Sequence, residues 1–430
     1  MFVDDPDPRL HPLPHRLDRR RFLQASAMGA AALMLPGCGG PQAPDGSRIN
    51  YWHHFTNQTE IRGLQRVTEM FLAAHPDIDL LQENIPNKDF MAKFTAAVQA
   101  QSVPDTTMVT SERLGNMHAM NSLVDLTDRV DNWPMRPDYP EDRWQGISID
   151  DKIYGVPAFA FVDWMYYRLD WLEEAGIAGP PTTLEEFQDT AIRLTDPAKG
   201  RYGFGMRAGD GGQFIVVDML EAFGSPIVVD GKAAIDISKA TEALRFFSEL
   251  FTVHKVVPPS APNDSYRQIM ESFRTGQTGM LWHGTGSLTE VQRSLSAQQF
   301  GTAVKPAGPE GVITRLSYLY NGMMKADNAD IAWAWVSFWG ETAPAVEFME
   351  ITGYFPASAR VAQDERVTGN PYFAAAVESV RIGRLPHQFV GADAWGRLTV
   401  LPAFQKILTG DRTPVQAAEE MAAGLEKILS

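Results

Sequence analysis

The feature that most constrains the fold is an alternation of short apolar segments with amphipathic segments of helical spacing. Residues 49–52 (INYW) predict a strand, because β-branched and aromatic side chains favour extended backbone. Apolar residues then recur at near-helical spacing and stop near His75-Pro76: Ile61, Leu64, Val67 and Phe71. A second strand starts at residues 78–81, and a second helical face covers residues 90–98. This β-α-β-α order predicts a parallel sheet flanked by helices.

The same alternation continues along the chain. Thr183 and Glu186 have the spacing of a capping box at the start of a helix. Residues 279–283 predict a buried strand, which ends in the glycine-containing run 284–287. Residues 330–339 predict a helix with three tryptophans that we expect to be core residues. A chain of 430 residues is long enough for two core-forming units.

The first 37 residues have the composition of an export signal. Arg19, Arg20 and Arg21 precede Phe22-Leu23 and an Ala- and Met-rich stretch, a pattern that resembles the twin-arginine signal. Residues 35–38 (LPGC) resemble a lipobox, and Cys38, the only cysteine, is the expected lipidation site. A buried helix and a chance buried cysteine are the alternative interpretations. Residues 38–47 read as a Gly/Pro linker.

Composition narrows the class of partner. The net charge of −15 argues against nucleic acid and anionic lipid. No run of 18 apolar residues is present, so we expect contact with the membrane only through a lipid anchor.

Several segments, in order along the chain, resemble the bacterial extracellular solute-binding proteins of the maltose-binding type. Those of highest specificity are residues 154–157 (YGVP), 165–168 (MYYR), 174–177 (EAGI) and 181–183 (PTT). Weaker matches are residues 49–53, 102–105, 122–127, 279–284, 332–340 and 352–357.

The resemblance implies an α/β fold of the two-lobed periplasmic-binding-protein type II, with hinge-crossing strands and a ligand cleft that closes by bending. It places lobe one at 48–157 and 313–365, and lobe two at 158–312 and 366–430. It implies an exported, lipid-anchored monomer that captures a sugar and delivers it to the permease subunits of an ABC importer, without catalysis or cofactor.

Sugar binding requires aromatic rings against the apolar faces of pyranoses and polar groups for their hydroxyls. We expect residues at strand ends and in loops of this chain to supply these rings and polar groups. The candidates are His53, His54, Ser111, Glu112, Asp163, Trp164, Trp282, His283, Tyr320, Asn321, Tyr354 and Trp395. For Asp163 the alternative is a hydrogen bond to a hinge backbone, and for Trp282 and Trp395 it is core packing. Where the family often has a cleft tryptophan, this chain has Gly286.

Other functions have weaker support. A polysaccharide hydrolase needs two positioned carboxylates, and pairs such as Asp150-Asp151 read as solvated turns. No HExxH motif or Cys/His cluster supports a metal site. A binding protein for a polyamine or a metal chelate remains open, since acidic residues in the cleft would favour a polyamine.

Overall fold

The computed structural model describes residues 47–324 and 327–430, and its main element is a nine-stranded mixed sheet. The order is β2-β1-β3-β12-β6-β10-β7, with β11 and β13 also paired to β6. The strands of this sheet are β1 (Arg48–His53), β2 (Asp79–Asn84), β3 (Thr106–Val109), β6 (Val156–Arg168), β7 (Tyr202–Gly205), β10 (Thr278–Gly284), β11 (Phe300–Ala303), β12 (Leu316–Met323) and β13 (Phe355–Pro356). Two small hairpins pair β4 (Ser148–Ile149) with β5 (Lys152–Ile153) and β8 (Val228–Val229) with β9 (Lys232–Ala233).

The predicted β-α-β-α opening is confirmed. Strand β1 lies parallel to β2 and to β3, with Tyr51 opposite Gln82 on one side and Thr106 on the other. Strand β12 then pairs antiparallel with both β3 and β6, and β10 pairs antiparallel with β6 and parallel with β7. Both parts of the sheet therefore contain parallel pairs joined through antiparallel strands.

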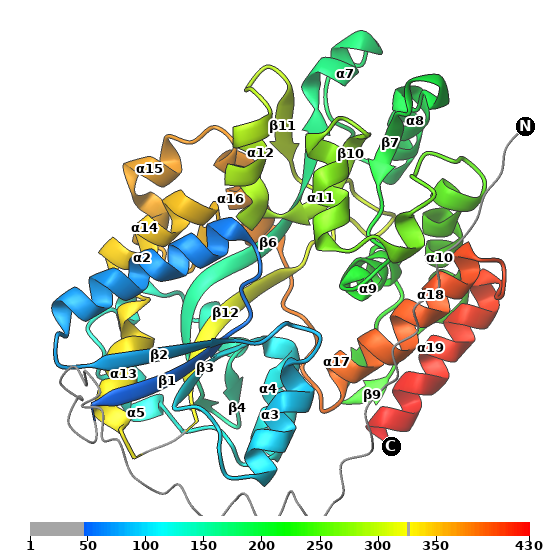
Figure 1. Cartoon of the computed structure of the whole chain (residues 1–430). Helices are drawn as coiled ribbons and strands as arrows, with labels where there is room; N and C mark the ends of the chain where they lie inside the picture. Colours follow the sequence, from blue (N-terminus) through cyan, green and yellow to red (C-terminus); the bar gives the residue numbers. More distant parts are fainter. Residues whose placement is uncertain (1–46, 325–326) are drawn as a thin grey trace, which may run out of the picture. The chain divides into compact units, whose positions relative to one another are not determined.

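Strand β6 is long enough to serve both parts of the sheet (Figure 1). Its first residues pair with β12 as far as Val162, and from Asp163 onward it pairs with β10. At this change of partner, the amide of Asp163 donates to the carbonyl of Arg315 at 3.2 Å, and the amide of Arg384 donates to the carbonyl of Thr314 at 3.0 Å. Three segments thus run side by side, which is the expected arrangement of crossing strands.

Helices cover the sheet (Figure 1). In the first half of the chain they are α2 (Gln58–Ala74), α3 (Phe90–Gln99), α4 (Ser111–Ala119), α5 (Thr127–Asp131), α6 (Asp142–Gln145), α7 (Leu169–Glu174), α8 (Leu184–Leu194) and α9 (Gly212–Ala222). In the second half they are α10 (Ile237–Thr252), α11 (Tyr266–Arg274), α12 (Leu288–Ser294), α13 (Ala329–Phe338), α14 (Thr342–Thr352), α15 (Glu365–Thr368), α16 (Phe373–Ile382), α17 (Ala392–Trp395), α18 (Leu401–Leu408) and α19 (Pro414–Leu429).

Short turns complete the elements. They are the 3₁₀ turns η1 (Arg136–Asp138), η2 (Pro197–Lys199), η3 (Ala261–Asn263), η4 (Thr285–Ser287) and η5 (Val361–Gln363), and the π-helical turn η6 (Gly396–Val400). The capping box predicted at Thr183 and Glu186 starts α8 as expected, and Asn57 with Glu60 forms another at α2.

The apolar side chains form separate cores. One lies between β1, α2, α13 and α14, and another joins β7, β10, α9, α10, α18 and α19. Trp335 and Trp339 are buried, as predicted for the tryptophan-rich helix, whereas Trp333 is only partly buried. In the stretches 47–324 and 327–430, no helix has the length and apolarity that a membrane span requires. The expected export signal with Arg19 and Arg20, and the expected lipidation site Cys38, lie outside the described residues.

Candidate functional site

A cleft of about 460 Å³ lies at the centre of the fold. Its volume is within the usual range of small-molecule sites. It is lined by His54, Phe55, Thr56, Glu60, Pro86, Asn87, Lys88, Thr110, Glu112, Arg113, Phe161, Arg207, Asp210, Phe214, Ser265, Tyr266, Arg267, Arg315, Ser317, Leu319, Tyr354, Asp393 and Arg397. These residues come from both parts of the sheet and from the crossing strands β6 and β12.

The parallel strands explain why these residues meet. His54 follows the carboxyl end of β1, Thr110 that of β3, and Arg207 lies two residues beyond β7. In α/β sheets, ligands bind beyond the carboxyl ends of the strands, where loops lead into helix N-termini. The N-terminal residues of α4, which follows β3, and of α9, which follows β7, line the cleft in this way.

Glu60 is fixed on one wall of the cleft by hydrogen bonds. Its Oε1 accepts from the hydroxyl of Tyr354 at 2.7 Å, and its Oε2 accepts from the amides of Thr56 at 2.9 Å and Asn57 at 3.1 Å. Burial raises the pKa of Glu60, although these hydrogen bonds oppose the shift. Asn57 also donates from Nδ2 to the hydroxyl of Tyr266 at 3.0 Å, which connects the start of α2 with the start of α11.

Tyr354 occupies the space that a side chain at position 286 would need. A Cβ on Gly286 would lie 2.4 Å from the Tyr354 ring. This ring lines the cleft, so the glycine at position 286 leaves room for an aromatic wall supplied by another segment.

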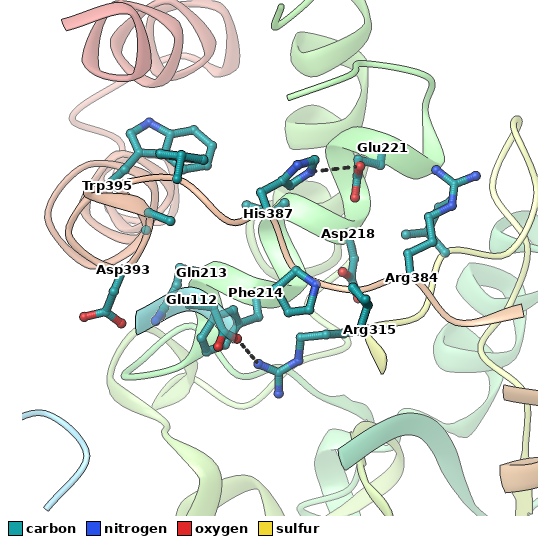
Figure 2. A pocket seen from close by; sticks show the side chains of 17 residues that line it. Glu112, Gln213, Phe214, Asp218, Glu221, Arg315, Arg384, His387, Asp393 and Trp395 are labelled. Atoms are coloured by element: carbon teal, nitrogen blue, oxygen red, sulfur yellow. Dashed lines mark hydrogen bonds and ion pairs between the residues drawn. The ribbon is translucent and has the colours of Figure 1, made fainter. Parts of the chain in front are cut away.

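Arg315 lies between two aromatic rings at the floor of the cleft. Its guanidinium carbon is 4.6 Å from the ring centroid of Phe161 and 4.1 Å from that of Phe214. Its nitrogens are 3.7 Å from Glu112 and 3.8 Å from Asp163, and Figure 2 shows the contact with Glu112. Arg315 therefore carries charge and apolar contacts at the point where the strands cross.

A smaller pocket of about 60 Å³ adjoins the cleft and shares Glu112, Phe214, Arg315 and Asp393 with it. Figure 2 shows its far side, where His387 contacts Glu221 at 3.2 Å. Asp218, on the wall of this pocket, pairs with buried Lys305 at 2.6 Å.

The structure brings four of the sequence-predicted residues to these two cavities. His54 and Tyr354 line the cleft, Glu112 lines both cavities, and Trp395 lines only the smaller one. Trp395 is 3% exposed, and its indole Nε1 donates to the carbonyl of Met421 at 3.0 Å.

Two further predicted residues lie directly behind the cleft wall. The ring of His283 packs 4.4 Å from that of Tyr266, and burial lowers its pKa to about 4. The carboxylate of Asp163 faces Arg315, and its backbone carbonyl accepts from the hydroxyl of Thr314 at 2.6 Å. The carboxylate of Asp163 thus faces a side chain at the crossing of the strands, and its contacts differ from the bond to a hinge backbone that the sequence left open.

The other predicted residues are buried away from the cavities. Trp164 packs edge-on to Tyr166, and Trp282 stacks on Phe247 with an interplanar angle of 4°. The remaining predicted site residues are all less than 7% exposed: His53, Ser111, Tyr320 and Asn321. None of these six residues is among those that line the two cavities.

Sequence reasoning missed the basic residues of the cleft. Arg113, Arg207 and Arg315 line it, and none of the three is among the residues expected from the sequence. Arg113 and Arg207 each follow the end of a strand within four residues, and that position could have identified them. Within residues 47–324 and 327–430, no group of three or more His, Cys, Asp or Glu side chains is placed to hold a metal ion.

Comparison with known proteins agrees with this geometry. A protein of Brucella abortus, described as a binding protein, is 22% identical over 85% of this chain and 89% of its own length. The maltotriose-binding protein of Pyrococcus abyssi is 23% identical over 75% of this chain and 69% of its own length. The GacH receptor of Streptomyces glaucescens, solved without ligand and with acarbose, has the same two-lobed fold: the TM-score is 0.81 at 19% identity, over 89% of this chain and 98% of that one.

The family assignment rests on most of the chain. Residues 66–375, which contain β6, β10 and β12 and most of the cleft wall, match the sequence model of the bacterial extracellular solute-binding proteins. These proteins bind solutes outside the cytoplasm. The chain belongs to the family of bacterial extracellular solute-binding proteins.

Proposed function

We propose that this protein captures a sugar outside the cytoplasmic membrane and delivers it to the permease subunits of an ABC importer. The observation that carries the proposal is the 460 Å³ cleft, which combines five aromatic rings with hydrogen-bonding side chains from both parts of the sheet. Pyranose rings need both kinds of contact. The maltotriose-binding relative supports the same ligand class.

Capture requires closure of the cleft, and the crossing strands supply the hinge. The proposed lobes are residues 48–157 with 313–365, and 158–312 with 366–430, and β6 changes partner between Val162 and Asp163. Few backbone torsions at such a crossing need to change when two lobes close around a ligand.

Cys38, if acylated, would hold the protein at the outer side of the membrane, next to the importer. The residues between Cys38 and β1 would act as the tether. A monomer suits this task, because one cleft serves one transporter at a time.

The alternatives are less compatible with the cleft. A polyamine would meet six basic side chains and only four carboxylates on the cleft wall. The chain belongs to a family of solute-binding proteins, which argues against the alternative function of a polysaccharide hydrolase.

A ligand screen tests the proposal. The protein from Cys38 onward is heated with neutral sugars, acidic sugars, polyamines and divalent metals, and binding to the folded state raises the melting temperature. We expect a saccharide to give the largest shift, and chromatography after long incubation to recover it unchanged. A shift only with polyamines or metals, or turnover of the sugar, would contradict the proposal.

A further inference from the structure

The cleft is basic in an acidic protein. Six basic side chains line it (Lys88, Arg113, Arg207, Arg267, Arg315 and Arg397) against four carboxylates (Glu60, Glu112, Asp210 and Asp393), whereas the whole chain has a net charge of −15. A concave site that differs in sign from the rest of the surface attracts ligands of the opposite sign.

All four carboxylates already have partners. Glu60 accepts the hydroxyl of Tyr354, and Glu112 lies 3.7 Å from Arg315. Asp393 accepts from Arg397 at 2.9 Å, and Asp210 contacts the same guanidinium. These contacts leave the charges of Arg113 and Arg207 without a carboxylate.

Arg113 is the clearest unpaired cation. It is 2% exposed, its Nη2 donates to the carbonyl and side-chain oxygens of Asn87, and its Nη1 is buried without a hydrogen-bond partner. Within the described stretches, no carboxylate lies within 4 Å of it. Burial lowers the pKa of Arg113 to about 10, so it remains charged at neutral pH. A buried charge with no carboxylate in direct contact is costly, and a bound anion would reduce that cost.

Arg207 presents a second guanidinium, from the loop between β7 and α9. Its Nε donates to the carbonyl of Asp210 at 2.7 Å, and it too has no carboxylate within 4 Å in the described part of the chain. Gly211 has φ of +86°, and a Cβ there would lie 1.7 Å from Nη2 of Arg207. The glycine therefore lets the loop curve closely around the guanidinium.

Backbone dipoles add to these charges. Helices α4, α9 and α11 begin at the cleft, with Glu112 and Arg113, Phe214, and Tyr266 lining it from their first turns. The N-terminus of a helix carries partial positive charge and favours bound anions. Buried side chains and helix ends thus favour the same sign of ligand.

We propose that the sugar bound in this cleft carries an oxyanion, a carboxylate or a phosphate group, and that Arg113 and Arg207 bind that group. The inference rests on the proposed function and narrows its ligand class. Guanidinium groups suit both oxyanions, because they donate two parallel hydrogen bonds to either.

Matched ligands test the inference by isothermal titration calorimetry: glucose, glucuronate and glucose 6-phosphate, and galactose, galacturonate and galactose 6-phosphate. We expect at least one acidic form to bind about tenfold or more tightly than its neutral parent, as charge-assisted hydrogen bonds would provide. The carboxylate and phosphate forms identify which oxyanion the site prefers.

Substitutions identify the residues. Arg113→Met and Arg207→Gln should each weaken binding of the acidic ligand about ten- to a hundredfold and change binding of the neutral parent much less. Lys232→Gln removes one charge from the exposed surface outside the cleft and should have a small effect. Melting temperatures show whether each variant folds. If Arg113→Met does not fold, Arg207→Gln alone tests the role of the guanidinium groups.

The outcomes separate the two proposals. Neutral sugars that bind as tightly as their acidic forms would overturn the anionic ligand and leave sugar capture intact. Binding of the acidic form that is equally weakened by Lys232→Gln would overturn the assignment to Arg113 and Arg207. Failure of every saccharide, neutral or acidic, would overturn sugar capture itself.

Discussion

The hydroxyl of Tyr354 donates a hydrogen bond to Oε1 of Glu60 at 2.7 Å, across 294 residues of sequence. The bond joins the segment after α14 to the first turn of α2, and both side chains line the cleft. One contact therefore fixes a side of the binding site and ties together distant parts of the chain.

Removal of this hydroxyl should cost stability. Tyr354→Phe leaves Oε1 of Glu60 without its partner and should lower the free energy of unfolding by about 1–3 kcal/mol. The Tyr354 bond lowers the pKa of Glu60, so the variant should raise that pKa further. Urea unfolding measures the first effect, with Tyr372→Phe as the control. Equal stabilities of Tyr354→Phe and the parent would show that the bond contributes nothing.

Gly286 should tolerate no side chain. In Gly286→Ala the new Cβ would meet the Tyr354 ring, which must move away from Glu60 and from its place in the cleft. Overpacking of this kind costs about 1–3 kcal/mol, and ligand affinity should fall as well. Gly179→Ala is the control, because nothing lies within 4 Å of its Cβ position. Normal melting and affinity in Gly286→Ala would mean that Tyr354 has room to adjust.

Trp395 is the residue for which core packing and ligand stacking are easiest to separate. Its burial and its bond to Met421 predict that Trp395→Ala costs about 3–5 kcal/mol of stability. Calorimetry with the identified sugar and thermal melting are measured on the same variant. A large loss of affinity with near-normal melting would instead support the stacking role expected from the sequence.

His283 should make the protein less stable in acid. Burial lowers its pKa to about 4, compared with about 6.5 in an unfolded chain, so the unfolded state binds the proton first. The contribution of His283 is complete above about pH 6.5 and is lost as the pH falls towards 4, by about 1.4 kcal/mol per pH unit. His283→Gln should flatten this part of the stability curve. An unchanged slope in His283→Gln would assign the acid sensitivity to other groups.

The N-terminal signal is tested in cells. Replacement of Arg19 and Arg20 together by Lys should block export, because the twin-arginine pair is the expected recognition element. Cys38→Ala should release the protein from the membrane or trap it unprocessed, with ligand affinity unchanged. Fractionation and immunoblotting measure both. Normal export of the double variant, or membrane retention without Cys38, would refute the respective assignment.

The sequence predicted the elements better than the site. Periodicity located α2 and α3 to within a few residues, because each has one apolar face that local spacing reveals, and the β-branched and aromatic residues located β1. It could not place Trp164 or Trp282, since both strand faces are covered and alternation does not say which face meets the cleft. Whether Arg113 has a carboxylate partner depends on where residues far away in the sequence lie in the fold. No local sequence pattern could therefore predict that it is unpaired.

The long shared strand β6 also sets when the protein can fold. Its partner β12 inserts between β3 and β6, so the first part of the sheet stays incomplete until residue 323 has been synthesised. The core that begins at Met165 closes only with Leu425 of α19. Pairings of such separation form slowly. The core between β1, α2, α13 and α14 also needs residues as far as Tyr354, so most of the chain must leave the ribosome before either core is finished. An export route that waits for completed cargo suits a chain built in this order.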